Sequence, residues 1–201
     1  MTPLYNFERD LLIIDTETLG LKDYHVICQW GSILLDRHTL EPKSNLSTLV
    51  YCTKDDLAIA SQEAMGIHGL DPTDLNDPAK TIKFPQLLDQ IIKIHGPSMR
   101  YHVYGANVYF DYNKISAMCH RYMVKNPLGR DAPNSCRIFD VQAFLNISSG
   151  AFGLGWRNGA LRSMCDHFGL PYSKHHSAHE DCELLADVMR SSMQQIHTLQ
   201  Q

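Results

Sequence analysis

The sequence predicts a single α/β domain with a mixed five-stranded sheet whose first three strands form an antiparallel meander. Residues 11–14 are a run of large, mostly branched apolar side chains, as expected of a strand buried on both faces. Two more strand-like runs follow after short connections, over 26–36 and 45–52, which favours a meander. From residue 61 onward, helical patterns alternate with short apolar runs, and this alternation is typical of α/β domains.

The later elements are marked by the residues that stop them. Gly69 ends an expected helix over 61–69, and Gly96-Pro97 ends an amphipathic helix over 81–95. The remaining expected elements alternate along the chain: a strand over 101–106, a helix over 110–125, a strand over 137–141, and helices over 158–168 and 179–199.

Length and composition narrow the class of protein. A chain of 201 residues suits one domain with a core of useful size. No apolar run is long enough to span a membrane, and residues 1–10 show no signal-peptide pattern. The six cysteines form no CxxC pair, which indicates reduced thiols and a cytoplasmic location. The net charge of −4 gives no general basic surface for duplex DNA, so a nucleic acid would have to be held locally.

Two carboxylates follow the first strand at positions 15 and 17. Side chains alternate along a strand, so Asp15 and Glu17 point the same way. Burying two carboxylates together costs free energy unless a cation compensates, and carboxylate oxygens suit Mg²⁺ or Mn²⁺. The alternative is an exposed strand end with two solvated acids.

Two further acidic positions lie at expected helix starts. Asp111 follows the strand over 101–106, where the alternative is a first-turn carboxylate favoured by the helix dipole. Asp181 lies in the first turns of the last helix, five residues after His176, where the alternative is a helix start with polar groups. A zinc site at His175, His176 and His179 would need a matching Cys or His pair, which the sequence lacks.

Taken together, these segments resemble the three motifs of the DnaQ-like DEDDh 3′→5′ exonucleases, which read DxETxG, NxxFD and HxAxxD in this order. The matching stretches are Asp15-Thr16-Glu17-Thr18-Leu19-Gly20, Asn107-Val108-Tyr109-Phe110-Asp111 and His176-Ser177-Ala178-His179-Glu180-Asp181. Each motif alone is weak, but all three in order on the expected elements are a strong signal. The resemblance covers about residues 10–195 of a single domain over 1–201. The motif style is closest to the exonuclease X and proofreading-subunit branches. Leu19 and Gly105 depart from the common Thr and His, which leaves the subfamily open.

The resemblance implies an RNase H-like fold with helices on both faces of the sheet, and a site for two Mg²⁺ or Mn²⁺ ions. It implies that Asp15 bridges the ions, that Glu17 and Asp181 hold the ion on the nucleophile side, and that Asp111 holds the other. It also implies that His176 is the general base, with an ordinary pKa near 6.5 that suits this task.

The remaining roles concern the base and the strand end. His175 and His179 are the competing candidates for the base, and the spacing to Asp181 favours His176. For His68 the alternative is a helix-capping or core histidine. The candidates for contacts with a 3′ end are Thr18, Leu19, Gly20, His68, Asn107 and Phe110.

The expected function is 3′→5′ hydrolysis of single-stranded nucleic acid, with DNA favoured and nucleoside 5′-monophosphates released. The expected partners are single-stranded 3′ ends and a polymerase or repair protein. The first alternative is an exoribonuclease of the RNase T or oligoribonuclease type, because the motifs do not encode a contact with the 2′-OH. The second is a non-catalytic binding module, which the complete acidic set disfavours.

Overall fold

The computed structural model describes residues 5–129, 136–153, 160–172 and 177–199. They form a mixed six-stranded sheet in the order β4-β3-β2-β1-β5-β6. The strands are β1 (Asp10–Thr18), β2 (Ile27–Leu35), β3 (Pro42–Val50), β4 (Thr81–Ile82), β5 (Tyr101–Gly105) and β6 (Ile138–Asp140). The first three strands pair antiparallel and confirm the meander, whereas β5 runs parallel to β1 and β6 parallel to β5.

The sixth strand is a correction to the expected five. Residues 81–82, expected to begin a helix, instead pair parallel with Leu49 and Val50 at the edge of the sheet. The helix α4 (Phe84–His95) starts only at Phe84, with Pro85 in its first turn. Proline lacks an amide hydrogen and favours this position, so it sets the helix start, and Lys83 just before the helix is extended.

The other helices are α1 (Lys54–Ala58), α2 (Gln62–His68), α3 (Pro72–Leu75), α5 (Val108–Arg121), α6 (Val141–Phe152), α7 (Leu161–Phe168) and α8 (Ala178–Leu199), with a 3₁₀ turn, η1, over Ser98–Arg100. The sequence did not predict α6, and the strand expected over 137–141 stops at Asp140. The Asp140 carboxylate accepts the Ala143 N–H and caps α6. None of the described helices has both the length and the apolar character needed to cross a bilayer.

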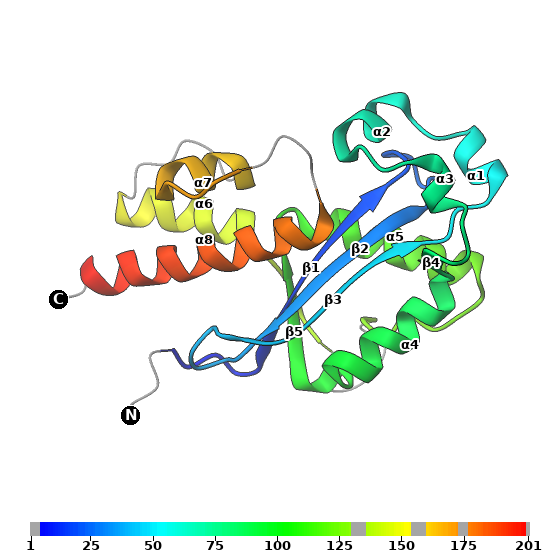
Figure 1. Cartoon of the computed structure of the whole chain (residues 1–201). Helices are drawn as coiled ribbons and strands as arrows, with labels where there is room; N and C mark the ends of the chain where they lie inside the picture. The colour runs from blue at the N-terminus through cyan, green and yellow to red at the C-terminus, as the bar shows by residue number, and fades with distance from the viewer. Residues whose placement is uncertain (1–4, 130–135, 154–159, 173–176, 200–201) are drawn as a thin grey trace.

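Helices cover both faces of the sheet, as expected (Figure 1). On one face, Leu12 and Ile14 of β1 pack in a core with α4 and α5. On the other face, Leu11 and Ile13 pack with α6, α7 and the long helix α8. Because side chains alternate along β1, Asp15 and Glu17 share the α8 face with Leu11 and Ile13.

Candidate active site

Three carboxylates from distant parts of the chain meet where β1 approaches its end. Asp15 and Glu17 project from β1, and Asp181 projects from the first turn of α8. Each can place a carboxylate oxygen within 4.8 Å of the other two, and all three are partly buried. This acidic trio consists only of oxygen donors, the set that suits Mg²⁺ or Mn²⁺.

The strand β2 places the start of α8 against the acids. Gly31 pairs with Asp15 across the sheet, and Gln29 pairs with Glu17. A Cβ on Gly31 would lie 2.2 Å from backbone atoms of Ala178, so only glycine allows this approach without a shift. The Gln29 Oε1 accepts the Ala178 N–H at 3.1 Å. The residues opposite the two strand acids therefore position the helix that carries Asp181.

The fourth carboxylate, Asp111, lies in the first turn of α5 and is 3% exposed. The hydroxyl of Thr16, between the two strand acids, donates to Asp111 Oδ1 at 2.7 Å. A Cβ on Gly105, at the end of β5, would lie 2.9 Å from the Ile14 carbonyl oxygen. Gly105 therefore permits close packing of the end of β5 against β1 and against Val108, the first residue of α5.

The crowding of four acids raises the pKa values of two of them. Burial raises the pKa of Asp111 to about 7, although the Thr16 hydroxyl stabilises its anion. Burial, and then the charges of Asp111, Asp181 and Glu17, raise the pKa of Asp15 well above its usual range. Such a group of carboxylates favours protonation or a bound cation, because either relieves the repulsion.

Two groups that feel the charge of these acids are Tyr172 and Cys182. Burial and the charge of Asp181 raise the pKa of Tyr172 to about 12. Burial and the charge of Asp15 raise the pKa of the Cys182 thiol well above its usual range. Both side chains therefore stay neutral near pH 7. Neither residue belongs to the three motifs, and only the tertiary structure brings Tyr172 near the acids.

A buried lysine fixes the loop that follows β1. The Lys114 ammonium, 3% exposed, donates to the carbonyl oxygens of Gly20, Lys22 and His25. Burial lowers the pKa of Lys114. Its ammonium also lies 5.3 Å from the centre of the Phe110 ring. Lys114 therefore links α5, one turn after Asp111, to the segment that directly follows Glu17 and Thr18.

The candidates for strand-end contacts differ in accessibility. Leu19 is fully buried in the core, its N–H donates to Val26 O, and its carbonyl accepts the Ser61 N–H. A strand-end contact by Leu19 would therefore require this segment to rearrange. Its neighbours in the motif are also enclosed, since Thr18 is 7% exposed and Gly20 is buried.

His68 is buried at the end of α2. Its Nδ1 accepts the Leu70 N–H at 3.1 Å, and its Nε2 lies 3.9 Å from Cys28 Sγ. Burial lowers its pKa. These contacts match the alternative of a capping or core histidine. By contrast, Asn107 is exposed and Phe110 partly exposed, so both have surface to offer a ligand.

The candidate general bases lie around the start of α8. His175 and the favoured His176 fall outside the described residues. His179 Nε2 lies 3.6 Å from Glu183 Oε1, one turn further along the same helix. The other ring nitrogen of His179, Nδ1, is buried and has no hydrogen-bond partner among the described residues.

The motif order and the meeting of the four acids agree with a comparison against known protein families. A family model described as an exonuclease, RNase_T, matches residues 12–189. The chain belongs to this exonuclease family. It has the DnaQ-like, RNase H-like fold, and its acidic trio can hold a divalent metal ion.

Solved exonuclease structures share the fold. Exonuclease I from Methylocaldum szegediense matches with a TM-score of 0.75 at 19% identity, covering 92% of this chain and 40% of that one. Another exonuclease I structure matches with a TM-score of 0.76 at 17% identity, with the same coverage. Exonuclease I from E. coli, in complex with a dT13 oligonucleotide, has a TM-score of 0.73 at 17% identity, covering 92% of this chain and 41% of that one. This chain therefore spans less than half the length of these proteins. No curated protein sequence matches.

Proposed function

We propose that this exonuclease removes nucleotides from the 3′ end of single-stranded DNA in a metal-dependent reaction. The observation that carries the proposal is the meeting of Asp15, Glu17 and Asp181 with the buried Asp111 beside them. These carboxylates would hold two Mg²⁺ or Mn²⁺ ions, which would supply activation of a water and stabilisation of the charge on the phosphate and the leaving oxygen. The all-oxygen donor set, and the raised pKa values of Asp15 and Asp111, suit the binding of divalent cations.

The chain's own residues would divide the work. Asp15 would contact both ions, Glu17 and Asp181 would hold the one nearer the attacking water, and Asp111 would hold the other. His176 would accept the proton of that water, because imidazole is a common general base near neutral pH.

The choice of substrate is part of the proposal. The structural likeness to an exonuclease I bound to dT13 supports single-stranded DNA. The match to a model named RNase_T supports RNA as the second candidate. Matched DNA and RNA strands of one sequence, digested side by side, separate the two. Faster cleavage of the DNA strand supports the proposal, whereas faster cleavage of RNA transfers the activity to the second candidate.

Product analysis tests polarity and reaction type together. With Mn²⁺, we expect nucleoside 5′-monophosphates to appear one at a time, because hydroxide attacks phosphorus and the 3′ oxygen leaves. A bulky group on the 3′ terminus should stop the reaction, whereas the same group on the 5′ terminus should not. Cleavage of a covalently closed single-stranded circle at the rate of the linear strand would identify an endonuclease and contradict the proposal.

A further inference from the structure

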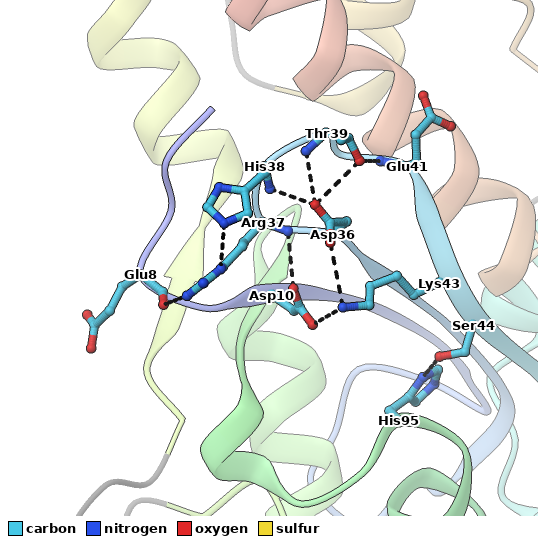
Figure 2. Close-up of polar contacts among 10 residues, drawn as sticks. All are labelled: Glu8, Asp10, Asp36, Arg37, His38, Thr39, Glu41, Lys43, Ser44 and His95. Carbon is cyan, nitrogen blue, oxygen red and sulfur yellow. Dashed lines mark hydrogen bonds and ion pairs between the residues drawn. The ribbon is translucent and has the colours of Figure 1, made fainter. Parts of the chain in front are cut away.

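A polar cleft of about 850 Å³ lies at the end of the sheet away from the acidic site. It is formed by the start of β1, the β2–β3 hairpin and the segment from the end of α4 through η1, and Figure 2 shows some of its polar side chains. Asp10, which lines the cleft at the start of β1, is five residues from Asp15, or about 17 Å along an extended strand. Five cationic side chains line it: Arg9, Arg37, Lys43, Lys93 and Arg100.

Two of the three carboxylates in the cleft accept hydrogen bonds from other groups of the protein (Figure 2). Asp10 accepts from Lys43 Nζ at 2.8 Å and from the Arg37 backbone N–H at 3.1 Å. Asp36 accepts the backbone N–H groups of His38 and Thr39. The His38 N–H is the main cause of the lowered pKa of Asp36. The third, Glu8, lies 3.9 Å from Arg9.

The other three cations, Arg37, Lys93 and Arg100, form no ion pair with a carboxylate in the described part of the chain. The Arg37 guanidinium donates to His38 Nε2 and to the Glu8 carbonyl, which are both uncharged acceptors (Figure 2). Lys93 and Arg100 are exposed, and neither forms an ion pair with any residue in the described part of the chain. The cleft thus holds three unpaired cations on a protein whose net charge is −4.

The floor of the cleft is neutral. Burial lowers the pKa of His95 to about 4, and its Nδ1 pairs with the Ser44 hydroxyl at 2.8 Å. The C-terminal end of α4 points into the same region and adds about half a negative charge. Lys93, in the last turn of α4, offsets this dipole. Arg37 and Arg100 still leave a positive surplus.

We propose that this cleft binds the phosphodiester backbone of a nucleic-acid strand, at a point remote from the carboxylates of the proposed active site. Its volume falls within the range of about 300–1,000 Å³ that is typical of ligand sites. Arginine forks and a lysine ammonium are the groups that proteins use to bind phosphate. The assignment to a strand rests on the proposed nuclease function, because a long substrate can reach both places at once.

The test is strand binding without turnover. Fluorescence anisotropy of a labelled oligothymidine of about 12 nucleotides, in EDTA, compares wild type with the Lys93→Gln/Arg100→Gln variant. The matched control is Lys54→Gln/Lys125→Gln, which removes two exposed lysines outside the cleft and changes the net charge equally.

Loss of two phosphate contacts should lower the slope of log K against log salt by roughly 1.4 and weaken binding about 25-fold at 0.1 M salt. The control should stay close to wild type. Equal affinities for the cleft variant and the control would overturn the proposal. Binding of AMP that depends on Lys93 and Arg100, with strand binding unchanged, would assign the cleft to free phosphate compounds instead. A wild-type protein without nuclease activity would contradict the proposed function while leaving this binding measurement intact.

Discussion

Replacing the buried acid Asp111 with asparagine should stabilise the metal-free protein at neutral pH. The side chain is 3% exposed, and burial raises its pKa to about 7 from an ordinary value of 3.8. Asparagine keeps an oxygen for the hydrogen bond that Thr16 donates at 2.7 Å. The variant therefore removes the buried negative charge and leaves the packing and this hydrogen bond in place.

The sign and size of the effect follow from proton linkage. The pKa of Asp111 is higher in the folded than in the unfolded chain, so folding takes up a proton between these values. The free energy of unfolding falls as pH rises through this window, by about 1.4 kcal/mol per pH unit. The full penalty at pH 8 is about 4 kcal/mol, and it almost vanishes near pH 4. Asp111→Asn should escape this loss.

Urea unfolding in EDTA, followed by circular dichroism across this pH range, measures the difference. The control is Asp56→Asn, because burial of Asp56 is outweighed by hydrogen bonds from Thr53 and Arg121 that lower its pKa. The Asp56 contribution is present at neutral pH and lost as pH falls through its folded pKa, so this variant should be less stable than wild type at pH 7. A less stable Asp111→Asn protein at pH 8 in EDTA would refute the account of buried charge. Saturating Mn²⁺ should reverse the ranking, because it stabilises wild type more.

Three further outcomes are expected. Gly31→Ala should cost about 1–3 kcal/mol in the free energy of unfolding and reduce cleavage, since its Cβ would overlap the start of α8. Gly66→Ala, with open space around the new Cβ, should be neutral or stabilising in the same urea unfolding measurement. Lys114→Met should lower stability by about 1–3 kcal/mol by leaving loop carbonyls unpaired, and hydrogen exchange should show a looser loop over 20–25. His176→Ala should slow single-turnover cleavage about 10²–10⁴-fold with unchanged Mn²⁺ affinity in calorimetry, whereas His179→Ala should change it little. A greater loss in the second histidine variant would show that the base is misassigned.

The sequence was sufficient for the features that local pattern determines. The apolar run before Asp15 predicted a buried strand, and the alternation of side chains predicted that Asp15 and Glu17 share a face. The stop at Gly69 was also predicted, and the structure has this glycine in the left-handed conformation that ends α2. Strong local signals of this kind depend little on the rest of the chain.

Features that depend on distant contacts could not be predicted in this way. The need for glycine at position 31 arises from the approach of Ala178, which no local pattern encodes. The helix α6 carries a Ser-Ser-Gly stretch with low helix propensity, and the cap from Asp140 compensates at its start. Leu19 is part of a motif, but its burial depends on its partners Val26 and Ser61. Motif order alone therefore does not show which members are accessible.

The most direct test of the central claim is a cleavage ladder from a strand labelled at its 5′ end, with and without Mn²⁺. We expect wild type to shorten the strand stepwise from the 3′ end only with Mn²⁺, and Asp15→Asn to leave it intact under the same conditions. Equal shortening by wild type in chelator after metal stripping, or by Asp15→Asn, would contradict a metal site at these carboxylates.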